Sequence, residues 1–393
     1  SKKCSNRIKI MKNVSDYWFT IEPYVFVDIK SKHILLYNTL DGVTIESTNE
    51  KIVELLQETL QEKNCGVALL THERYRQGGV CCFVDELREK FMGDVINVSL
   101  SDGKPVQILP FYNYSKEQEL YKKNNFSSYK NILEKLFEIS LHIDATTNIT
   151  KLIHFLITLP KNLTFNIVGN MEEVPNYGEL FSYLDHCSSP KNLLCSYKNI
   201  IALQPIFAHN FSYQISVSFP IDVERWNHAM KVLLSQALPV EFVFEVSSEE
   251  DVQQSERLIE QYQIDKYRLK PNYTGNNIRF FENEVFLSKE DILSSPMTMK
   301  DFFARQAMNL YDFGKITILP NGDVYANLNH PSLGNIHVNN IQEILHKEVE
   351  EGKSWFRVRN QAPCTDCVYQ WICPSPSNYE IAIGRSNLCH VKE

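Results

Sequence analysis

Strands and helices alternate along residues 101–310, as the pattern of hydrophobic positions indicates. In the stretch 137–143, apolar residues alternate with Glu138, Ser140 and His142, a period of two that is typical of a half-buried β-strand. The other expected strands are 106–111, 163–168, 213–219, 240–246 and 267–269. The expected helices lie near 132–136, 149–159, 177–187, 222–233 and 252–261. Because such alternation builds parallel βαβ units, we expect an α/β fold with a partial (β/α)6, TIM-like barrel.

The region before the barrel, residues 12–100, has the pattern of a small α+β domain. Its expected strands are 24–29, 34–37 and 43–46, and its expected helices are 52–60 and 84–91. The polar turn Lys30-Ser31-Lys32 predicts a hairpin between the first two strands. Asn49 stands where a helix cap is needed before the first apolar stripe.

The region after the barrel, residues 311–393, is shorter and richer in turns. Pro320-Asn321-Gly322-Asp323 predicts a hairpin turn between a strand at 315–319 and one at 324–326. A helix is expected at 341–349, and the cysteine-rich segment ends the chain. The expected domains are therefore 12–100, 101–310 and 311–393.

Composition and charge narrow the class of protein. The chain has 393 residues, 43% of them hydrophobic, and a formal net charge of −8. An acidic chain is not expected to bind nucleic acid, and no apolar run reaches the length of a membrane span. The basic, polar start lacks the apolar core of a signal peptide, so we expect a cytoplasmic protein. Residues 1–11 are expected to be a disordered arm or a cloning remnant, with Met11 as the native start.

Four of the ten cysteines form the candidate site. Cys364, Cys367, Cys373 and Cys389 have the spacing Cys-x2-Cys-x5-Cys-x15-Cys. Four thiolates suit an iron–sulfur cluster or a zinc ion. Two disulfides or free thiols are the other interpretations, and the spacing alone leaves all of them open. The remaining cysteines are expected to be reduced and mostly buried, including the adjacent pair Cys81-Cys82 and the nearby Cys187 and Cys195.

Three elements of residues 311–393 resemble the SPASM domain that follows the partial barrel in many radical-SAM peptide maturases. They are Ile318-Leu319-Pro320-Asn321-Gly322-Asp323-Val324-Tyr325-Ala326, then Gly334-Asn335-Ile336, then the Cys-x2-Cys-x5-Cys run. The run 373–380, Cys-Pro-x-x-Ser-Asn-Tyr-Glu, is similar to the maturases of the GG-peptide systems of Bacteroidales. Those systems also encode a companion called a pseudo-radical-SAM protein. The resemblance implies a barrel of the radical-SAM type and an iron–sulfur domain after it.

Carried onto this chain, the resemblance makes the four cysteines the ligands of the second auxiliary [4Fe–4S] cluster. The first auxiliary cluster would need cysteines where the chain has Asn327 and Ser377. The radical-SAM triplet Cys-x3-Cys-x2-Cys is missing, and so is the Gly-Gly-Glu that would hold S-adenosylmethionine. The resemblance therefore implies one cluster, no S-adenosylmethionine and a protein that is not an enzyme.

The function expected from this resemblance is a non-catalytic role in the maturation of ribosomal peptides. The strands and helices of 12–100 resemble the winged-helix elements that bind a precursor leader by adding it to a sheet edge. The expected partners are that leader and an active radical-SAM maturase. The alternatives are an electron-transfer subunit that uses the same cluster, and a zinc-stabilised peptide-binding module. A third alternative is an enzyme with new chemistry in the barrel, for which Asp144 and Asn170 are the candidates.

Single residues near these motifs have simpler expected roles. His142 lacks a second histidine at ligand spacing and is expected to be structural. Tyr369 and Trp371 lie between ligands and are expected to shield the cluster from water.

Overall fold

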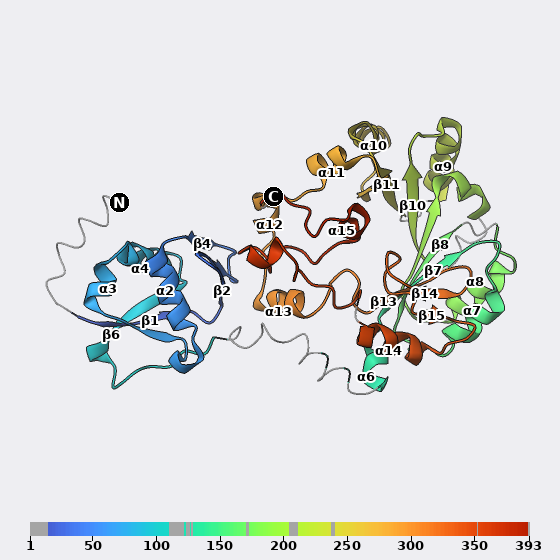
Figure 1. The fold of residues 1–393 in the computed structure, drawn as a ribbon. Helices are drawn as coiled ribbons and strands as arrows, with labels where there is room; N and C mark the ends of the chain where they lie inside the picture. The colour runs from blue at the N-terminus through green and yellow to red at the C-terminus, as the bar shows by residue number, and fades with distance from the viewer. Residues whose placement is uncertain are drawn as a thin grey trace.

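A computed structural model describes residues 15–109, 122, 126, 129–169, 173–203, 211–236, 240–351 and 353–391. Its strands form a nine-stranded sheet and two three-stranded sheets. In Figure 1 the N-terminal unit lies at one side, the large sheet lies at the other, and the segment with the C-terminus runs between them. Within the described ranges, no helix is both long and apolar enough to cross a membrane.

The large sheet has the order β12-β11-β10-β9-β8-β7-β13-β14-β15. Its strands are β7 (Glu138–Ile143), β8 (Thr164–Gly169), β9 (Lys191–Ser196), β10 (Ser212–Ser218), β11 (Val240–Val246), β12 (Tyr267–Pro271), β13 (Lys315–Ile318), β14 (Asp323–Tyr325) and β15 (Gly334–Asn335). Neighbours from β12 to β13 pair in parallel, and β14 and β15 add antiparallel pairs. The predicted α/β fold with a parallel sheet is confirmed. From β7 to β12 the spatial order follows the chain, so right-handed crossovers place their helices on one face.

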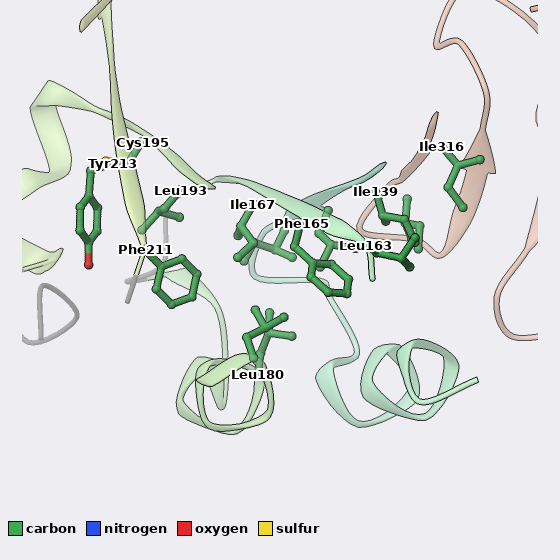
Figure 2. Packing of buried hydrophobic residues seen from close by; sticks show 14 of the residues in the cluster. Ile139, Leu163, Phe165, Ile167, Leu180, Leu193, Cys195, Phe211, Tyr213 and Ile316 are labelled. Carbon is green, nitrogen blue, oxygen red and sulfur yellow. The ribbon is translucent and has the colours of Figure 1, made fainter. Parts of the chain in front are cut away.

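The helices of this region are α6 (Tyr129–Glu134), α7 (Ile149–Leu156), α8 (Tyr177–Asp185), α9 (Val223–Gln236) and α10 (Glu249–Tyr262). The buried side chains of the strands and of α7, α8 and α9 form one hydrophobic core. Figure 2 shows Phe165 and Ile167 of β8 and Leu193 of β9 on the side of the sheet that faces Leu180 of α8. The alternating residues of β7 divide as predicted, because Ile139 is buried in the core while His142 is half-buried.

Two predictions for this region are wrong. Residues 106–109 are irregular and not a strand, and the rest of that predicted strand lies outside the described residues. Strand β9 was not predicted because it begins with Lys191-Asn192. Lys191 is nevertheless buried, and its Nζ donates to the carbonyl oxygens of Leu184 (3.0 Å) and Cys187 (2.7 Å) at the end of α8. These bonds satisfy the charge, which allows a lysine inside the core.

The N-terminal unit contains two antiparallel sheets around its own core. The first sheet, β2-β3-β4, consists of β2 (Val25–Lys30), β3 (His33–Asn38) and β4 (Thr44–Ser47). The predicted hairpin is confirmed, with Ser31 in its turn at a positive φ of 52°. The second sheet, β5-β1-β6, was not predicted as a sheet; it consists of β1 (Tyr17–Ile21), β5 (Val67–Leu70) and β6 (Gly93–Asn97).

The helices of the N-terminal unit are α2 (Glu50–Thr59), α3 (His72–Arg76) and α4 (Val80–Glu89). Asn49 caps α2 as predicted, because its side chain accepts a hydrogen bond from Lys51 N at 3.0 Å. Cys81 is a reduced, buried thiol on α4, but Cys82 is exposed and disulfide-bonded, so the prediction of a reduced, buried thiol is wrong for Cys82. Successive helical residues point in different directions, so adjacent cysteines cannot both face the core.

The C-terminal region begins on the large sheet and ends beside the N-terminal unit. The predicted hairpin β13–β14 is confirmed, and Gly322 adopts the positive φ of 86° that its turn requires. The later helices are α14 (Ile341–Glu351) and α15 (Asn378–Ile383). Before the hairpin come three unpredicted helices, α11 (Ile278–Glu284), α12 (Lys289–Leu293) and α13 (Met299–Ala307). A third hydrophobic cluster joins this region to the β2-β3-β4 sheet.

Candidate metal centre

The four cysteines predicted as ligands line one cavity. It is bounded by Cys364, Cys367, Cys373 and Cys389 together with Leu287, Ile292, Arg359, Pro363, Gln370, Asn387, Leu388 and Val391. About 400 Å³ within it is free of protein atoms, part of it open to solvent. All four cysteines carry free thiols. Cysteines that are up to 25 positions apart in the sequence are thus brought to one place.

Local hydrogen bonds position each cysteine. Cys364 begins a short 3-10 turn (Cys364–Asp366), and the backbone N–H of Cys367 donates to the carbonyl of Cys364 at 3.1 Å. Cys373 closes the next turn by donating to the Tyr369 carbonyl at 2.8 Å. Cys389 forms an isolated parallel bridge with Leu287, which ties the end of the chain to the segment before α12. The cavity is therefore closed by segments from two regions of the chain.

By ligand chemistry alone, four thiols at one cavity suit either an iron–sulfur cluster or a zinc ion. In the described part of the chain, no group of three or more His, Cys, Asp or Glu is placed to hold a single metal ion. In a [4Fe–4S] cluster each cysteine binds a different iron, so the four thiolates do not meet at one point. The same four thiols satisfy the ligand chemistry of zinc.

Burial raises the pKa of the Cys373 thiol to about 12, although Arg359 acts in the opposite direction. Burial likewise raises the pKa of Cys364. A metal centre would bind the thiolate forms and release their protons. Positive charge at this cavity would favour the thiolate forms.

Arg359 supplies that charge and was not predicted from the sequence. Its Nη1 lies 3.9 Å from Cys364 Sγ, and its Nε donates to the Pro374 carbonyl at 2.6 Å. Its Nη2 forms a buried ion pair with Glu380 Oε1 at 2.9 Å. A buried guanidinium held on three sides has a fixed direction toward the thiols. Nothing in the local sequence separates this arginine from the neighbouring Arg357.

The residues between the ligands take different positions relative to the cavity. Tyr369 and Trp371 do not line the cavity, and Gln370 between them does. Tyr369 instead packs in the third hydrophobic cluster, on the side of the N-terminal unit. His390, next to Cys389, does not line the cavity, and its Nε2 lies 2.8 Å from the Glu282 carbonyl oxygen.

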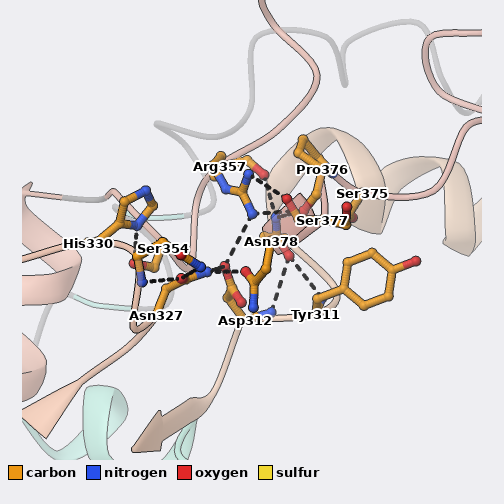
Figure 3. A network of polar contacts seen from close by, with 12 residues as sticks. Tyr311, Asp312, Asn327, His330, Ser354, Arg357, Ser375, Pro376, Ser377 and Asn378 are labelled. Atoms are coloured by element: carbon orange, nitrogen blue, oxygen red, sulfur yellow. Dashed lines mark hydrogen bonds and ion pairs between the residues drawn. The ribbon is translucent and has the colours of Figure 1, made fainter. Parts of the chain in front are cut away.

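A polar network occupies the place where the resemblance would put the first auxiliary cluster (Figure 3). Asn327 Nδ2 donates to Asp312 Oδ2 at 2.9 Å, and both side chains are buried. Arg357 lies 3.6 Å from the same carboxylate and donates to the Ser377 carbonyl at 3.1 Å. Ser377 itself caps α15, with its Oγ donating to Glu380 Oε2 at 2.6 Å. Amide, hydroxyl and carboxylate groups that satisfy one another fill this position.

The candidate residues for new barrel chemistry are less organised. Asp144 follows β7 and accepts hydrogen bonds from the Thr146 backbone (2.7 Å) and hydroxyl (2.6 Å), as in an ordinary turn. Asn170 lies outside the described residues. Burial lowers the pKa of His142, and Lys270 lowers it further. Cys187 and Cys195 are free thiols, as predicted.

Comparisons with known proteins give no family. Neither the known protein families nor the curated proteins contain a match to this chain. Among solved structures, SuiB of Streptococcus suis bound to S-adenosylmethionine is 11% identical with a TM-score of 0.37, over 94% of this chain and 98% of that chain. The protein anSMEcpe with bound AdoMet is 10% identical with a TM-score of 0.40, over 60% of this chain and 88% of its own. Likenesses at such TM-scores carry no argument about function.

Proposed function

We propose that this chain is a non-catalytic, pseudo-radical-SAM protein of ribosomal peptide maturation that carries one [4Fe–4S] cluster. The observation that supports this most directly is the convergence of Cys364, Cys367, Cys373 and Cys389 on one cavity. The sequence supports the non-catalytic part, because it lacks the Cys-x3-Cys-x2-Cys triplet. The β7–β12 region would be a degenerate partial barrel, and the C-terminal region would be SPASM-like.

In this proposal the chain's own residues hold the cluster and shape its surroundings. The four thiolates would bind the irons, leaving no open iron for substrate, and Arg359 would offset part of their negative charge. Leu287, Ile292 and Leu388 on the cavity wall would limit access of water. A cluster of this kind supplies structural cross-linking or one-electron transfer.

The proposed partners are a precursor leader peptide and an active radical-SAM maturase. β2 and β4 form the two edges of the β2-β3-β4 sheet, and β5 and β6 form the edges of the other sheet. An edge strand offers backbone groups that an extended peptide can pair with. The leader would bind at one of these edges, and the barrel would dock the maturase.

Electron transfer is the second candidate function, favoured by the position of two ligands. Cys373 and Cys389 are only partly buried, so a centre bound there would lie near the surface. Efficient electron exchange with a partner requires such proximity. Both candidates use the same four thiolates.

The experiment is metal and sulfide analysis with a UV–visible spectrum on protein purified without oxygen. About four irons and four sulfides per chain, with a broad band near 400 nm that dithionite bleaches, support the proposal. One zinc without sulfide would replace it with a zinc-stabilised peptide-binding module. About seven or more irons would show that a further cluster exists, and the non-catalytic assignment would then be wrong.

A further inference from the structure

The segment from Cys367 to Cys373 both lines the metal cavity and packs in the third hydrophobic cluster. Cys367, Gln370 and Cys373 line the metal cavity. Val368, Tyr369 and Ile372 belong to the third hydrophobic cluster, which also contains buried side chains of the N-terminal sheet. Those N-terminal members are Phe26, Leu35 and Tyr37. Cys367 is also a member of this cluster and Cys373 packs against it, so the segment with two candidate ligands packs together with the N-terminal sheet.

A polar connection runs from the N-terminal sheet to the wall of the cavity. Lys30 Nζ, at the end of β2, donates to Gln370 Oε1 at 2.6 Å. Gln370 Nε2 in turn donates to the backbone carbonyl of Arg359. Arg359 is the residue whose guanidinium lies beside Cys364. The N-terminal sheet is therefore two hydrogen bonds away from the arginine that faces the thiols.

Aromatic and backbone contacts hold the sheet against the same region. Phe26 stacks on Phe302 of α13 with ring centroids 4.0 Å apart, and Tyr37 meets the same ring edge-on at 5.4 Å. The Tyr37 hydroxyl accepts a hydrogen bond from the Met297 backbone N–H at 2.9 Å. Glu46 of β4 pairs with Lys289 at 2.8 Å, and the Lys289 ammonium lies 5.5 Å from the Tyr369 ring centroid. The buried contacts of Phe26 and Tyr37 fix one docked position rather than a range of positions.

We propose that the N-terminal sheet is a structural part of the metal centre, with Lys30 and Tyr37 as positioning residues for the Cys367–Cys373 segment. This inference rests on the proposed metal centre. Partners that orient metal ligands without touching the metal contribute to metal affinity. Docking of the sheet and retention of the metal are therefore linked, and each changes the other by the same factor.

The linkage gives the centre a role in the proposed function. A peptide that binds the N-terminal unit and moves β2 or β3 changes how firmly the metal is held. Conversely, loss of the metal frees the Cys367–Cys373 segment and weakens the docking of the sheet. How firmly the metal is held would thus depend on whether the N-terminal sheet is docked. The two parts are far apart in sequence, because Lys30 and Gln370 are separated by 340 positions.

The test compares the rate of metal loss to a chelator in the full chain and in three variants. Lys30→Met removes the bond to Gln370, and Tyr37→Phe removes only the hydroxyl that binds Met297 N. Lys32→Met is the matched control, because Lys32 is exposed and pairs only with Glu50 among the described contacts, at 3.0 Å. We expect metal loss to be about 10-fold or more faster in Lys30→Met and measurably faster in Tyr37→Phe, with Lys32→Met unchanged.

Hydrogen exchange of β2 and β3 provides the reciprocal measurement. Removing the metal from the wild-type protein is expected to accelerate exchange in these strands, while the strands β10 and β11 keep their protection. Tyr37→Phe leaves the Asp28–Lys30 pair intact, so it tests the linkage even where Lys30→Met unfolds the unit. The inference would be overturned if all variants lost metal at the wild-type rate and if metal removal did not change hydrogen exchange in β2 and β3. The proposed metal centre would then still stand. A wild-type protein that binds no metal would overturn both.

Discussion

Asn327 Nδ2 donates a hydrogen bond to Asp312 Oδ2 at 2.9 Å, and neither residue is more than 6% exposed (Figure 3). Burial raises the pKa of Asp312, while Asn327 and Arg357 oppose that rise. Asn327 and Arg357 therefore stabilise the ionised form of the Asp312 carboxyl group. The resemblance to the SPASM domain would place a cluster ligand at position 327. Asn327 instead completes a buried polar network.

Replacing Asn327 by Ala should destabilise the fold. The change leaves the buried Asp312 carboxylate without one of its donors, which costs about 1–3 kcal/mol of unfolding free energy. Urea denaturation followed by fluorescence measures this difference. Asn283→Ala is the control, because Asn283 is exposed on α11, and its cost should stay within about 0.5 kcal/mol. Equal stability of both variants would contradict the role given to the network.

Replacing Asp28 by Asn should stabilise the protein at neutral pH. Burial raises the pKa of Asp28 from 3.8 to about 6, although Lys30 opposes the rise. The folded state therefore holds the proton more tightly than the unfolded state, and wild-type stability falls as the pH rises from about 4 to about 6. The Asp28→Asn variant lacks this loss, so it should be more stable above pH 6, by at most about 3 kcal/mol.

The measurement for Asp28 is thermal or chemical unfolding at several pH values. The two proteins should have similar stabilities near pH 4 and should separate as the pH rises. A difference that is independent of pH would mean that Asp28 is not the titrating group.

Replacing Cys373 by Ser should remove most of the bound metal. The hydroxyl is a much poorer soft-metal ligand than a thiolate, and metal binding contributes to folding free energy. Metal content and melting temperature are measured on protein prepared without oxygen. If the centre is structural, metal content and melting temperature should fall together. If it transfers electrons, the fold and the complex with the maturase should stay intact while turnover by the maturase is lost.

Cys187→Ser is the control for the Cys373 variant. Cys187 carries a free thiol that is outside the cavity and lies 3.5 Å from the Tyr183 carbonyl oxygen. Its replacement should leave the metal content unchanged. Wild-type metal content in Cys373→Ser would exclude Cys373 as a ligand.

Replacing Lys191 by Met should destabilise the large sheet. The variant keeps an apolar stem in the core but leaves the carbonyls of Leu184 and Cys187 without their donor, at a cost of about 1–3 kcal/mol. Chemical denaturation provides the measurement. Lys161→Met changes an exposed lysine of the same region and should have almost no effect. If the two variants lose equal stability, the lysine does not hold the end of α8 in place.

The sequence by itself determined the elements whose side chains follow a local period. The alternation in 137–143 predicted β7, and the turn at Gly322 predicted the β13–β14 hairpin, because both depend on neighbours within a few positions. The cysteine spacing likewise identified four candidate ligands, since a Cys-x2-Cys turn brings two thiols together locally.

Only the tertiary structure decided what surrounds those ligands. Lys191 reads as a polar break, but its side chain is buried at the start of β9 because the carbonyls of Leu184 and Cys187 accept its protons. Arg359 and Gln370 reached the cavity through packing, and Lys30 joined them from the other end of the chain. Such contacts depend on burial and, for Lys30, on a partner 340 positions away. A local pattern of hydrophobic and polar residues contains no information about either.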